Sequence, residues 1–274
     1  MNLLVAFLTT ATITAIAVGT MLLVRRRAPA GSYFNDGDRA AGVFGVLASG
    51  FAILLGFIVF LAFTSYDSAR AGAEAESIAI AQQLETAQLF DAATASELTG
   101  ELACYARYVV GTEWDEMEDG TIGDAPNPWG VAMFRTVQGI DPQTPVQEAA
   151  YAKWLDQLSE REVARHDRVH GAVGIIPSPL WIVLLLIAFV IFGYTLIFAD
   201  SAERAWVQAM LMGSVVAVIV MLLLLLQFLD NPFRRGVGTL KPVAMERTVR
   251  FADRVDGIVG HEKPWPCNAV GNAR

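Results

Sequence analysis

Two histidines have the spacing in this chain that best matches a metal site. His166 and His170 are four residues apart, which places both imidazoles on one side of a helix, with Asp167 between them. The run differs from the HExxH zinc motif by Asp in place of Glu. No third ligand accompanies the pair, so the sequence predicts neither a metal site nor a cofactor.

Other signatures of enzyme chemistry are absent from the sequence. It contains no phosphate-binding Gly-Lys-Ser/Thr loop, no nucleophile elbow and no paired-cysteine metal motif. The acidic cluster at 113–119 lacks the glycine and the ligand order of an EF-hand loop, so solvated charge is its simplest interpretation. We therefore expect a protein that is not an enzyme.

Three phenylalanines recur at steps of three residues within one apolar run. Phe57, Phe60 and Phe63 end just before Thr64 and Tyr66. In a ring of subunits such a ladder could narrow a conduit, because apolar constrictions close by dewetting. The alternative is that these rings face lipid or pack within one subunit, which is the ordinary role of apolar residues in a span.

Charged residues follow this ladder directly. Acids at the mouth of a pore attract cations, and Asp67, Glu74 and Glu76 are the candidates here. Arg70 lies three residues after Asp67 and four before Glu74, which favours solvated ion pairs on a helix instead. Glu76 is then the freest acid of the group.

Four charge-free apolar runs indicate that the chain is a membrane protein. They are Asn2–Val24, Ala40–Tyr66, Pro179–Ala199 and Ala205–Leu229. Each is long enough for the roughly 20 helical residues that cross a bilayer. None carries an interior Asp, Glu, Lys or Arg, which argues against a proton pump or an ion-coupled carrier that relies on buried ionisable groups. The predicted fold is an all-α integral membrane protein with four transmembrane helices.

The polar segments divide the rest of the chain. A helical, acidic extramembrane domain is expected between the second and third spans, and a tail with an amphipathic helix from about 242 to 258 after the fourth. The predicted segments are 1–24 (span), 25–39 (polar loop), 40–66 (span), 67–178 (acidic domain), 179–199 (span), 200–204 (tight loop), 205–229 (span) and 230–274 (tail).

Within the acidic domain, apolar spacing predicts one or two long helices over about 65–112. Residues 113–143 are rich in acids, proline and glycine and are expected to be irregular. A helix should restart at Pro145, with Thr144 as its N-cap.

The charge of the chain argues against a nucleic-acid partner. The net charge is −8, and residues 67–168 hold 19 acids and 7 bases. Nucleic-acid phosphates require surfaces rich in Lys and Arg. The expected partners are the lipid bilayer, inorganic ions and further copies of the chain.

Small residues form smooth stripes on the first two spans, and such stripes let helices approach closely in lipid. The two spans could pack on each other or on neighbouring subunits, while a plain excess of Ala and Gly in spans is the simpler alternative. The stripes are Ala11, Ala15 and Gly19 on the first span, and Ala41, Gly45, Ser49, Ala52 and Gly56 on the second.

The two cysteines and the arginines bear on orientation. Cys104 and Cys267 are separated by two crossings, so they lie on the same side of the membrane and could form a disulfide if that side is oxidising. Arg25–Arg27 and Arg39 favour a cytoplasmic first loop, with the acidic domain and both termini outside. Arg234 and Arg235, after the fourth span, favour the reverse.

Three short motifs resemble the bestrophin-like domain family of bacterial and plant membrane proteins. One departure is Glu76, which stands where the family pattern has Asn. The motifs are Tyr66-Asp67-Ser68-Ala69-Arg70 with Glu74-Ala75-Glu76-Ser77-Ile78, then Ile176-Pro177 with Leu180-Trp181, and Leu229-Asp230-Asn231-Pro232-Phe233.

The resemblance implies a distant similarity to bestrophins, pentameric anion channels with an apolar neck on the second span. The Phe57, Phe60 and Phe63 ladder is the matching feature. Bestrophins hold their soluble region in the cytosol, whereas Arg25–Arg27 favour the opposite side here. The acidic domain suits cations better than anions.

The leading hypothesis is a homo-oligomeric ion channel in a bacterial plasma membrane, lined by the second span and preferring cations. The alternative is a non-conducting sensor or assembly subunit that binds partners through residues 67–178.

Overall fold

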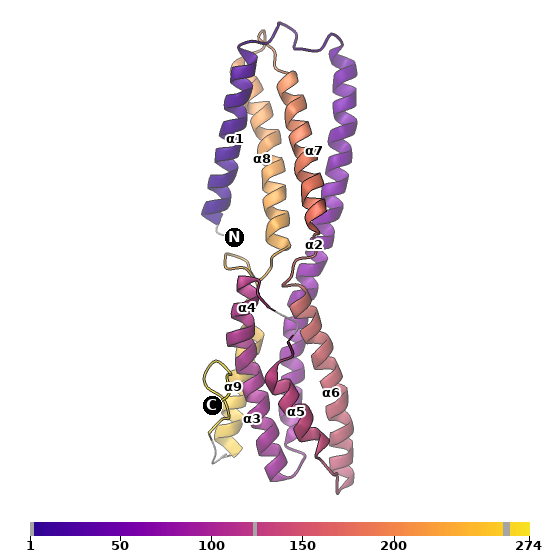
Figure 1. Ribbon diagram of the computed structural model, residues 1–274, viewed down its shortest axis with the longest axis vertical. Helices are drawn as coiled ribbons and strands as arrows, with labels where there is room; N and C mark the ends of the chain where they lie inside the picture. The colour runs from indigo at the N-terminus through magenta and orange to yellow at the C-terminus, as the bar shows by residue number, and fades with distance from the viewer. Residues whose placement is uncertain (1–2, 123–124, 260–263) are drawn as a thin grey trace. The chain divides into compact units, whose positions relative to one another are not determined.

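Helices form the regular structure of the described residues, which are 3–122, 125–259 and 264–274 of this computed structural model. In these ranges the β-type pairing is limited to an isolated bridge between Cys267 and Ala273. The elements in Figure 1 are α1 (Leu3–Arg25), α2 (Gly37–Ala87), α3 (Ala92–Tyr108), the π-helical turn η1 (Val109–Glu113), α4 (Trp114–Asp119), α5 (Pro128–Gln138), α6 (Pro145–His170), α7 (Ser178–Ile197), α8 (Ala205–Leu229) and α9 (Val243–Val259).

The chain forms two units, and α2 contributes to both. Residues 1–65 and 175–230 make the first, here called the membrane unit, and residues 66–174 and 231–274 make the second, the extramembrane unit. The sequence analysis predicts the tail as a separate segment, but in the structure residues 231–274 belong to the extramembrane unit. That unit is therefore more than an insertion between the second and third spans.

Among the described residues, four helices are long and apolar enough to cross a membrane, as the sequence predicts: α1, α2, α7 and α8. Within the membrane unit, α1 lies beside α8 (Figure 1). Their contact is made by Ala17 and Met21 on α1 and by Met212 and Val216 on α8, all buried. A Cβ at Gly213 would lie 3.3 Å from Val18, so the absence of a side chain there permits the close approach.

Polar contacts also tie the loops of the membrane unit together. The Arg25 guanidinium donates to the carbonyl oxygens of Ser201 and Glu203. The Asp200 carboxylate accepts from the Gly31 amide at 3.0 Å. The loop after α1 is therefore fastened to the turn between α7 and α8.

The core of the extramembrane unit is built from the second part of α2, α3, η1, α4, α5, α6 and α9. Small residues bring α2 and α6 into backbone contact, because a Cβ at Gly72 would lie 2.7 Å from the Ala164 carbonyl oxygen. The fully buried large side chains of this core are Trp154, Arg161, Arg168, Tyr105, Phe233, Ile80, Leu84, Leu98, Leu102 and Met117.

Two of the predicted helices are confirmed and one predicted loop is wrong. Thr144 caps α6 and accepts from the Gln147 amide, and α9 covers the predicted amphipathic segment of the tail. The Pro/Gly-rich stretch, however, contains α5. Asn127 caps that helix and Pro128 occupies its first turn, where a proline is tolerated.

Candidate functional site

One side of α2 in the membrane unit is not covered by any described residue of the chain. Phe57, Phe60 and Phe63 are 60%, 60% and 52% exposed, whereas Leu55 and Ala62 on the other side are buried. The helix therefore has one face held by the unit and one apolar face without a partner. The structure places the three predicted phenylalanines on this free face.

The small-residue stripe continues the same face toward the start of α2. Its members Ala41, Gly45, Ser49, Ala52 and Gly56 are all exposed. A Cβ added at Gly45 or Gly56 would meet nothing within 4 Å in the described chain. This face can accept a close neighbour, but the chain itself does not supply one.

The stripe on α1 does not pack against α2. Ala11, Ala15 and Gly19 are exposed, and α1 makes its contacts with α8 through the adjacent residues Ala17 and Met21. The expectation that the two stripes pack on each other within one chain is therefore wrong. The physical reason is that α8 already packs closely against α1. Gly213 of α8 lies so near α1 that an added Cβ would contact it.

In the extramembrane unit, α2 carries the charges expected at a pore mouth, and two of the three acids are exposed. Asp67 and Glu74 face solvent. Arg70 Nε lies 3.3 Å from Glu74 Oε1, so the predicted i, i+4 ion pair is confirmed. Such an exposed pair contributes little to stability.

Glu76 differs from the expectation, because its side chain is fully buried. Arg168 of α6, itself fully buried, donates to it from Nε at 2.5 Å and from Nη2 at 3.1 Å. The interpretation of Glu76 as the freest acid at a pore mouth is therefore wrong. It is an internal ligand of an arginine that stands 92 residues away in sequence.

A second acid completes the pairing of this arginine. Arg168 Nη2 donates to Glu113 Oε2 at 2.6 Å, and Arg165 donates to the other oxygen of Glu113 at 3.1 Å. Burial opposes ionisation of Glu113, but the two guanidinium groups outweigh burial and hold the pKa of that carboxyl below its usual value. Burial likewise disfavours the charged form of Arg168, but the carboxylates of Glu76 and Glu113 outweigh burial and raise the pKa of Arg168 above its usual value.

Two further side chains, Tyr105 and Arg161, extend this group of buried polar residues. The Tyr105 hydroxyl donates to Glu76 Oε1 at 2.6 Å, and burial together with that carboxylate raises the pKa of Tyr105. Arg161 lies over the Tyr105 ring at 4.9 Å and donates to Gln83 at 3.1 Å. Residues of α2, α3, η1 and α6 thus meet in one buried polar cluster, which we call the Arg168 cluster: Glu76, Tyr105, Glu113, Arg161, Arg165 and Arg168.

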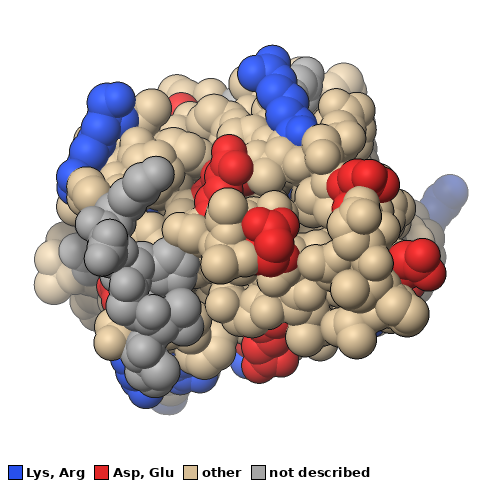
Figure 2. Space-filling model, turned by 90° about the horizontal axis from the view of Figure 1, so that it is seen from below, with Lys and Arg blue, Asp and Glu red and all other residues tan. Residues whose placement is uncertain are grey.

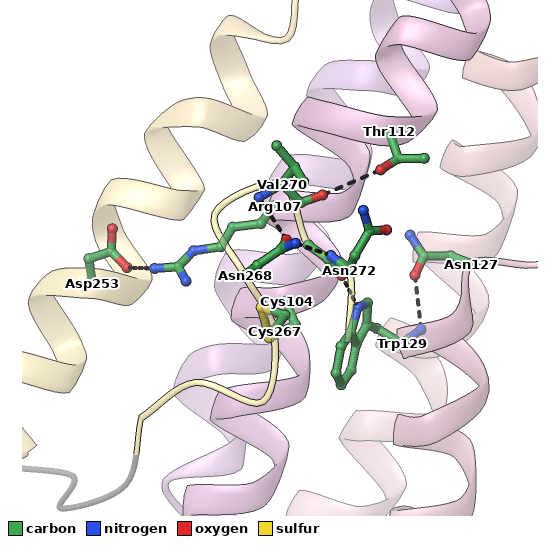
Figure 3. The surroundings of a disulfide bond; sticks show 11 residues. Cys104, Arg107, Thr112, Asn127, Trp129, Asp253, Cys267, Asn268, Val270 and Asn272 are labelled. Atoms are coloured by element: carbon green, nitrogen blue, oxygen red, sulfur yellow. Dashed lines mark hydrogen bonds and ion pairs between the residues drawn. A yellow bond between two sulfur atoms is a disulfide. The ribbon is translucent and has the colours of Figure 1, made fainter. Parts of the chain in front are cut away.

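A disulfide fastens the tail to α3. Cys104 and Cys267 are joined, and the loop that follows Cys267 lies against α3 and α5 (Figure 3). Trp129 donates from Nε1 to the Gly271 carbonyl at 2.5 Å. Gly271 has a φ of +83° and passes so close to Tyr108 that a side chain would not fit. The tail is therefore part of the unit's packing.

A further buried acid lies between α3 and α5. Glu101 accepts a hydrogen bond from the Thr136 hydroxyl at 3.1 Å. Burial raises the pKa of Glu101 to about 7, against the opposing effect of that hydrogen bond. Unlike the acids of the Arg168 cluster, Glu101 has no ion-pair partner among the described residues.

The structure does not build a metal site from the histidine pair. His166 and His170 lie with their rings stacked at 5.7 Å, and the described residues contain no group of three or more His, Cys, Asp or Glu that could hold an ion. On the face drawn in Figure 2, acidic side chains are spread among uncharged ones and form no dense patch.

Two of the three sequence motifs are joined by direct contacts. Asp230 Oδ1 accepts from the Ile175 and Ile176 amides at 2.9 and 3.0 Å, which links the start of the third span to the end of the fourth. In the extramembrane unit, the Tyr66 hydroxyl donates to the Gly238 carbonyl at 3.1 Å, and Phe233 packs edge-on against Trp114. The motif residues therefore make structural contacts inside each unit.

The family model described as Bestrophin-like domain matches residues 11–243. The chain belongs to the Bestrophin-like family.

Solved structures agree with this assignment at the level of the fold. A bacterial bestrophin homolog from Klebsiella pneumoniae, solved by Zn-SAD phasing, is 14% identical with a TM-score of 0.65, and the match covers 96% of this chain and 100% of that one. Two single-residue variants of the Klebsiella pneumoniae homolog give TM-scores of 0.67 and 0.65 at 14% and 12% identity; the matches cover 93% and 92% of this chain and 99% and 98% of theirs. No curated protein matches the chain.

This Bestrophin-like protein is therefore an integral membrane protein, with the predicted disulfide partners bonded and one predicted pore-mouth acid buried. The Arg168 cluster is what sequence reasoning missed. Arg161, Arg165 and Arg168 follow helical spacing, so they lie on one side of α6, and that pattern could have marked an interior basic stripe. Nothing local indicates that Glu76, Tyr105 and Glu113 are their partners.

Replacing Arg168 by Met should lower the melting temperature of the detergent-solubilised protein by roughly 10 °C, because it leaves the buried Glu76 carboxylate without a cation and Glu113 with Arg165 alone. Adding Glu76→Gln should recover part of the loss, since it removes the orphaned charge. Circular dichroism melts of the single and double variants measure both effects. Glu74→Gln is the exposed control and should change little; strictly additive losses for Arg168 and Glu76 would contradict the pairing.

Glu101 should make stability fall as pH rises. Its folded-state pKa is raised from 4.5 to about 7, so the folded protein holds this proton more tightly than the unfolded chain. The carboxyl is harmless below about pH 4.5, and its ionisation costs stability progressively as pH rises to about 7. Glu101→Gln should remove this component, so its melting temperature should exceed that of the parent at pH 8 and depend less on pH. Glu85→Gln is the exposed control, and equal pH profiles for parent and Glu101→Gln would refute the assignment.

Proposed function

We propose that this protein is one subunit of a homo-oligomeric ion channel whose pore is lined by the exposed face of α2. The observation that carries the proposal is the uncovered face itself, which bears three exposed phenylalanines and a continuous run of small residues. Membership of the Bestrophin-like family supports it. A single helix cannot enclose a conduit, so several copies must surround a common axis.

Phe57, Phe60 and Phe63 are the proposed constriction. An apolar ring that is narrow enough expels water, and ions that cannot shed their hydration do not pass until it widens. The glycines before Phe57 let neighbouring copies of α2 approach closely. No ionisable side chain is needed for such a gate, in agreement with the charge-free span.

The preference for cations rests on Asp67 and Glu74, since Glu76 is buried and paired. Asp67 is an exposed acid, whereas Glu74 is partly neutralised by Arg70. A ring of Asp67 side chains contributed by several copies would raise the local concentration of cations. The excess of acids over bases in residues 67–168 acts in the same direction.

The disulfide supports a topology in which the extramembrane unit and both termini face an oxidising compartment. Disulfides persist outside the cytoplasm and are rare inside it. The basic loop at 25–39 would then be cytoplasmic, which agrees with the positive-inside rule. Both arguments favour the same side, although they come from different parts of the chain.

Planar-bilayer recording of the purified protein should detect single-channel currents, and Phe60→Ala should increase the conductance or the open probability several-fold by widening the apolar ring. Phe189→Ala is the control, because Phe189 is also an exposed phenylalanine but lies on α7, outside the proposed pore. Absence of currents would favour the non-conducting sensor or assembly subunit. Currents that respond equally to both variants would remove Phe60 from the constriction.

Thiol labelling should report the topology without background, because both native cysteines are in the disulfide. In spheroplasts, an impermeant maleimide should label Gln138→Cys, which is exposed in the extramembrane unit, but not Ser201→Cys between α7 and α8. Lysis should make both positions reactive. Labelling of Ser201→Cys alone in intact spheroplasts would reverse the topology.

A further inference from the structure

Two open grooves of opposite charge flank α2 in the extramembrane unit. The first, of about 740 Å³, lies between α2 and the segment that leads into α9. Its charged lining consists of three cations, Arg70, Lys241 and Arg247, and one acid, Glu74. Since Glu74 pairs with Arg70, the excess charge of this basic groove comes from Lys241 and Arg247.

The second groove, of about 690 Å³, lies between α2 and α6. Its charged lining is the reverse of the first, with three acids, Asp156, Glu160 and Asp167, and one cation, Lys153. These side chains recur at steps of three, four and seven residues, so they form one exposed row along α6. We call this the acidic groove.

The charges that dominate the two grooves have no ion-pair partner within the described chain. Lys241 and Arg247 on one side, and Asp156, Glu160 and Asp167 on the other, are exposed and unpaired there. Other surface charges of the same unit do find partners, as Arg107 does with Asp253 and Arg235 with Glu118. The dominant charges of the two grooves differ from these pairs, because their opposite charges lie on the other groove.

One residue lines both grooves and marks the ridge between them. Ile78 of α2 belongs to each lining and is 57% exposed. It stands on the side of α2 opposite Glu76 and Ile80, which are buried in the core. Val163, 61% exposed, adds an apolar contact to the acidic groove.

We propose that the basic groove of one copy of this chain docks against the acidic groove of the next copy. This proposal rests on the homo-oligomer proposed above and names the surfaces that build it. Because the two grooves differ, the contact is head-to-tail, and a head-to-tail contact repeats until a ring closes. Lys241 and Arg247 would meet Asp156, Glu160 and Asp167, so charges left unpaired in one chain are paired between chains.

The position of Ile78 sets which side of the ring faces inward. The two grooves lie on either side of this ridge, so pairing them around a ring leaves the ridge of α2 at the inner side. The exposed charges supply orientation and specificity, since like-charged grooves repel each other. The apolar residues in the grooves, Ile78 and Val163 among them, supply area that becomes buried.

Cysteine cross-linking distinguishes a head-to-tail ring from other assemblies. Ser159→Cys places a thiol in the acidic groove and Ala244→Cys places one in the basic groove, and neither changes a charge. With the native cysteines oxidised, a flexible bis-maleimide should convert the double variant into a ladder of covalent multimers. Each single variant alone should stay monomeric on the denaturing gel, and coexpressed single variants should give dimers only.

Charge reversal provides the second arm. Asp156→Lys with Asp167→Lys, or Lys241→Glu with Arg247→Glu, should abolish the oligomer seen by native mass measurement in nanodiscs, and the four substitutions combined should restore it. Glu148→Lys and Arg135→Glu are exposed charge-reversal controls outside both grooves and should leave the oligomer unchanged.

The outcomes separate this inference from the channel itself. A wild-type oligomer with no ladder, or single-cysteine variants that cross-link to themselves, would overturn the groove pairing while leaving the channel proposal standing. Failure of the fourfold variant to reassemble would also overturn it. A wild-type protein that is monomeric in nanodiscs would overturn both proposals.

Discussion

A guanidinium group that cannot lose its proton lies fully buried in the extramembrane unit, and the packing around it follows from that constraint. Arg168 must be met by anions, because an unpaired buried charge costs several kcal/mol. Glu76 from α2 and Glu113 from η1 supply them. A single side chain of α6 thereby determines where two other elements lie.

The consequence for α2 is that its rotation about its own axis is fixed. Glu76 must face Arg168, and Gly72, one turn earlier, must face the backbone of α6 at Ala164. The opposite side of the helix is then directed away from the core, which is where Ile78 is found. The buried ion pair on one side of α2 thus decides which residues are exposed on the other side. Apolar packing alone would fix the rotation of the helix less precisely.

The disulfide lies near the C-terminal end of α3, where Cys104 directly precedes Tyr105 of the Arg168 cluster. It joins residues separated by 163 positions and so restricts the unfolded chain strongly, while Trp129 and Gly271 seat the tail locally. Such a disulfide persists in compartments where thiols are oxidised. The tail, which looks like an appendage in sequence, is an integral part of the unit.

Features with local signals could be predicted from the sequence. The four spans follow from charge-free length, α6 from a Thr-Pro start, and α9 from its amphipathic spacing. α5 was hidden because its proline and glycine are typical of loops, although Asn127 before Pro128 is also a helix start.

The burial of Glu76 could not be predicted, because its partner is remote in sequence and an acid just beyond a span is ordinarily solvated. The same limit applies to the stripes: small residues indicate close packing but do not say against which helix. The structure shows that α8 is the neighbour of α1 and leaves the face of α2 unoccupied within the described chain.

A cryo-EM map of the full-length protein in lipid nanodiscs examines the central idea most directly. We expect a closed ring in which α2 of every copy surrounds the axis and Phe60 points toward it. A ring whose axis is lined by α1, α7 or α8, or a lone subunit with Phe60 in contact with lipid, would contradict it.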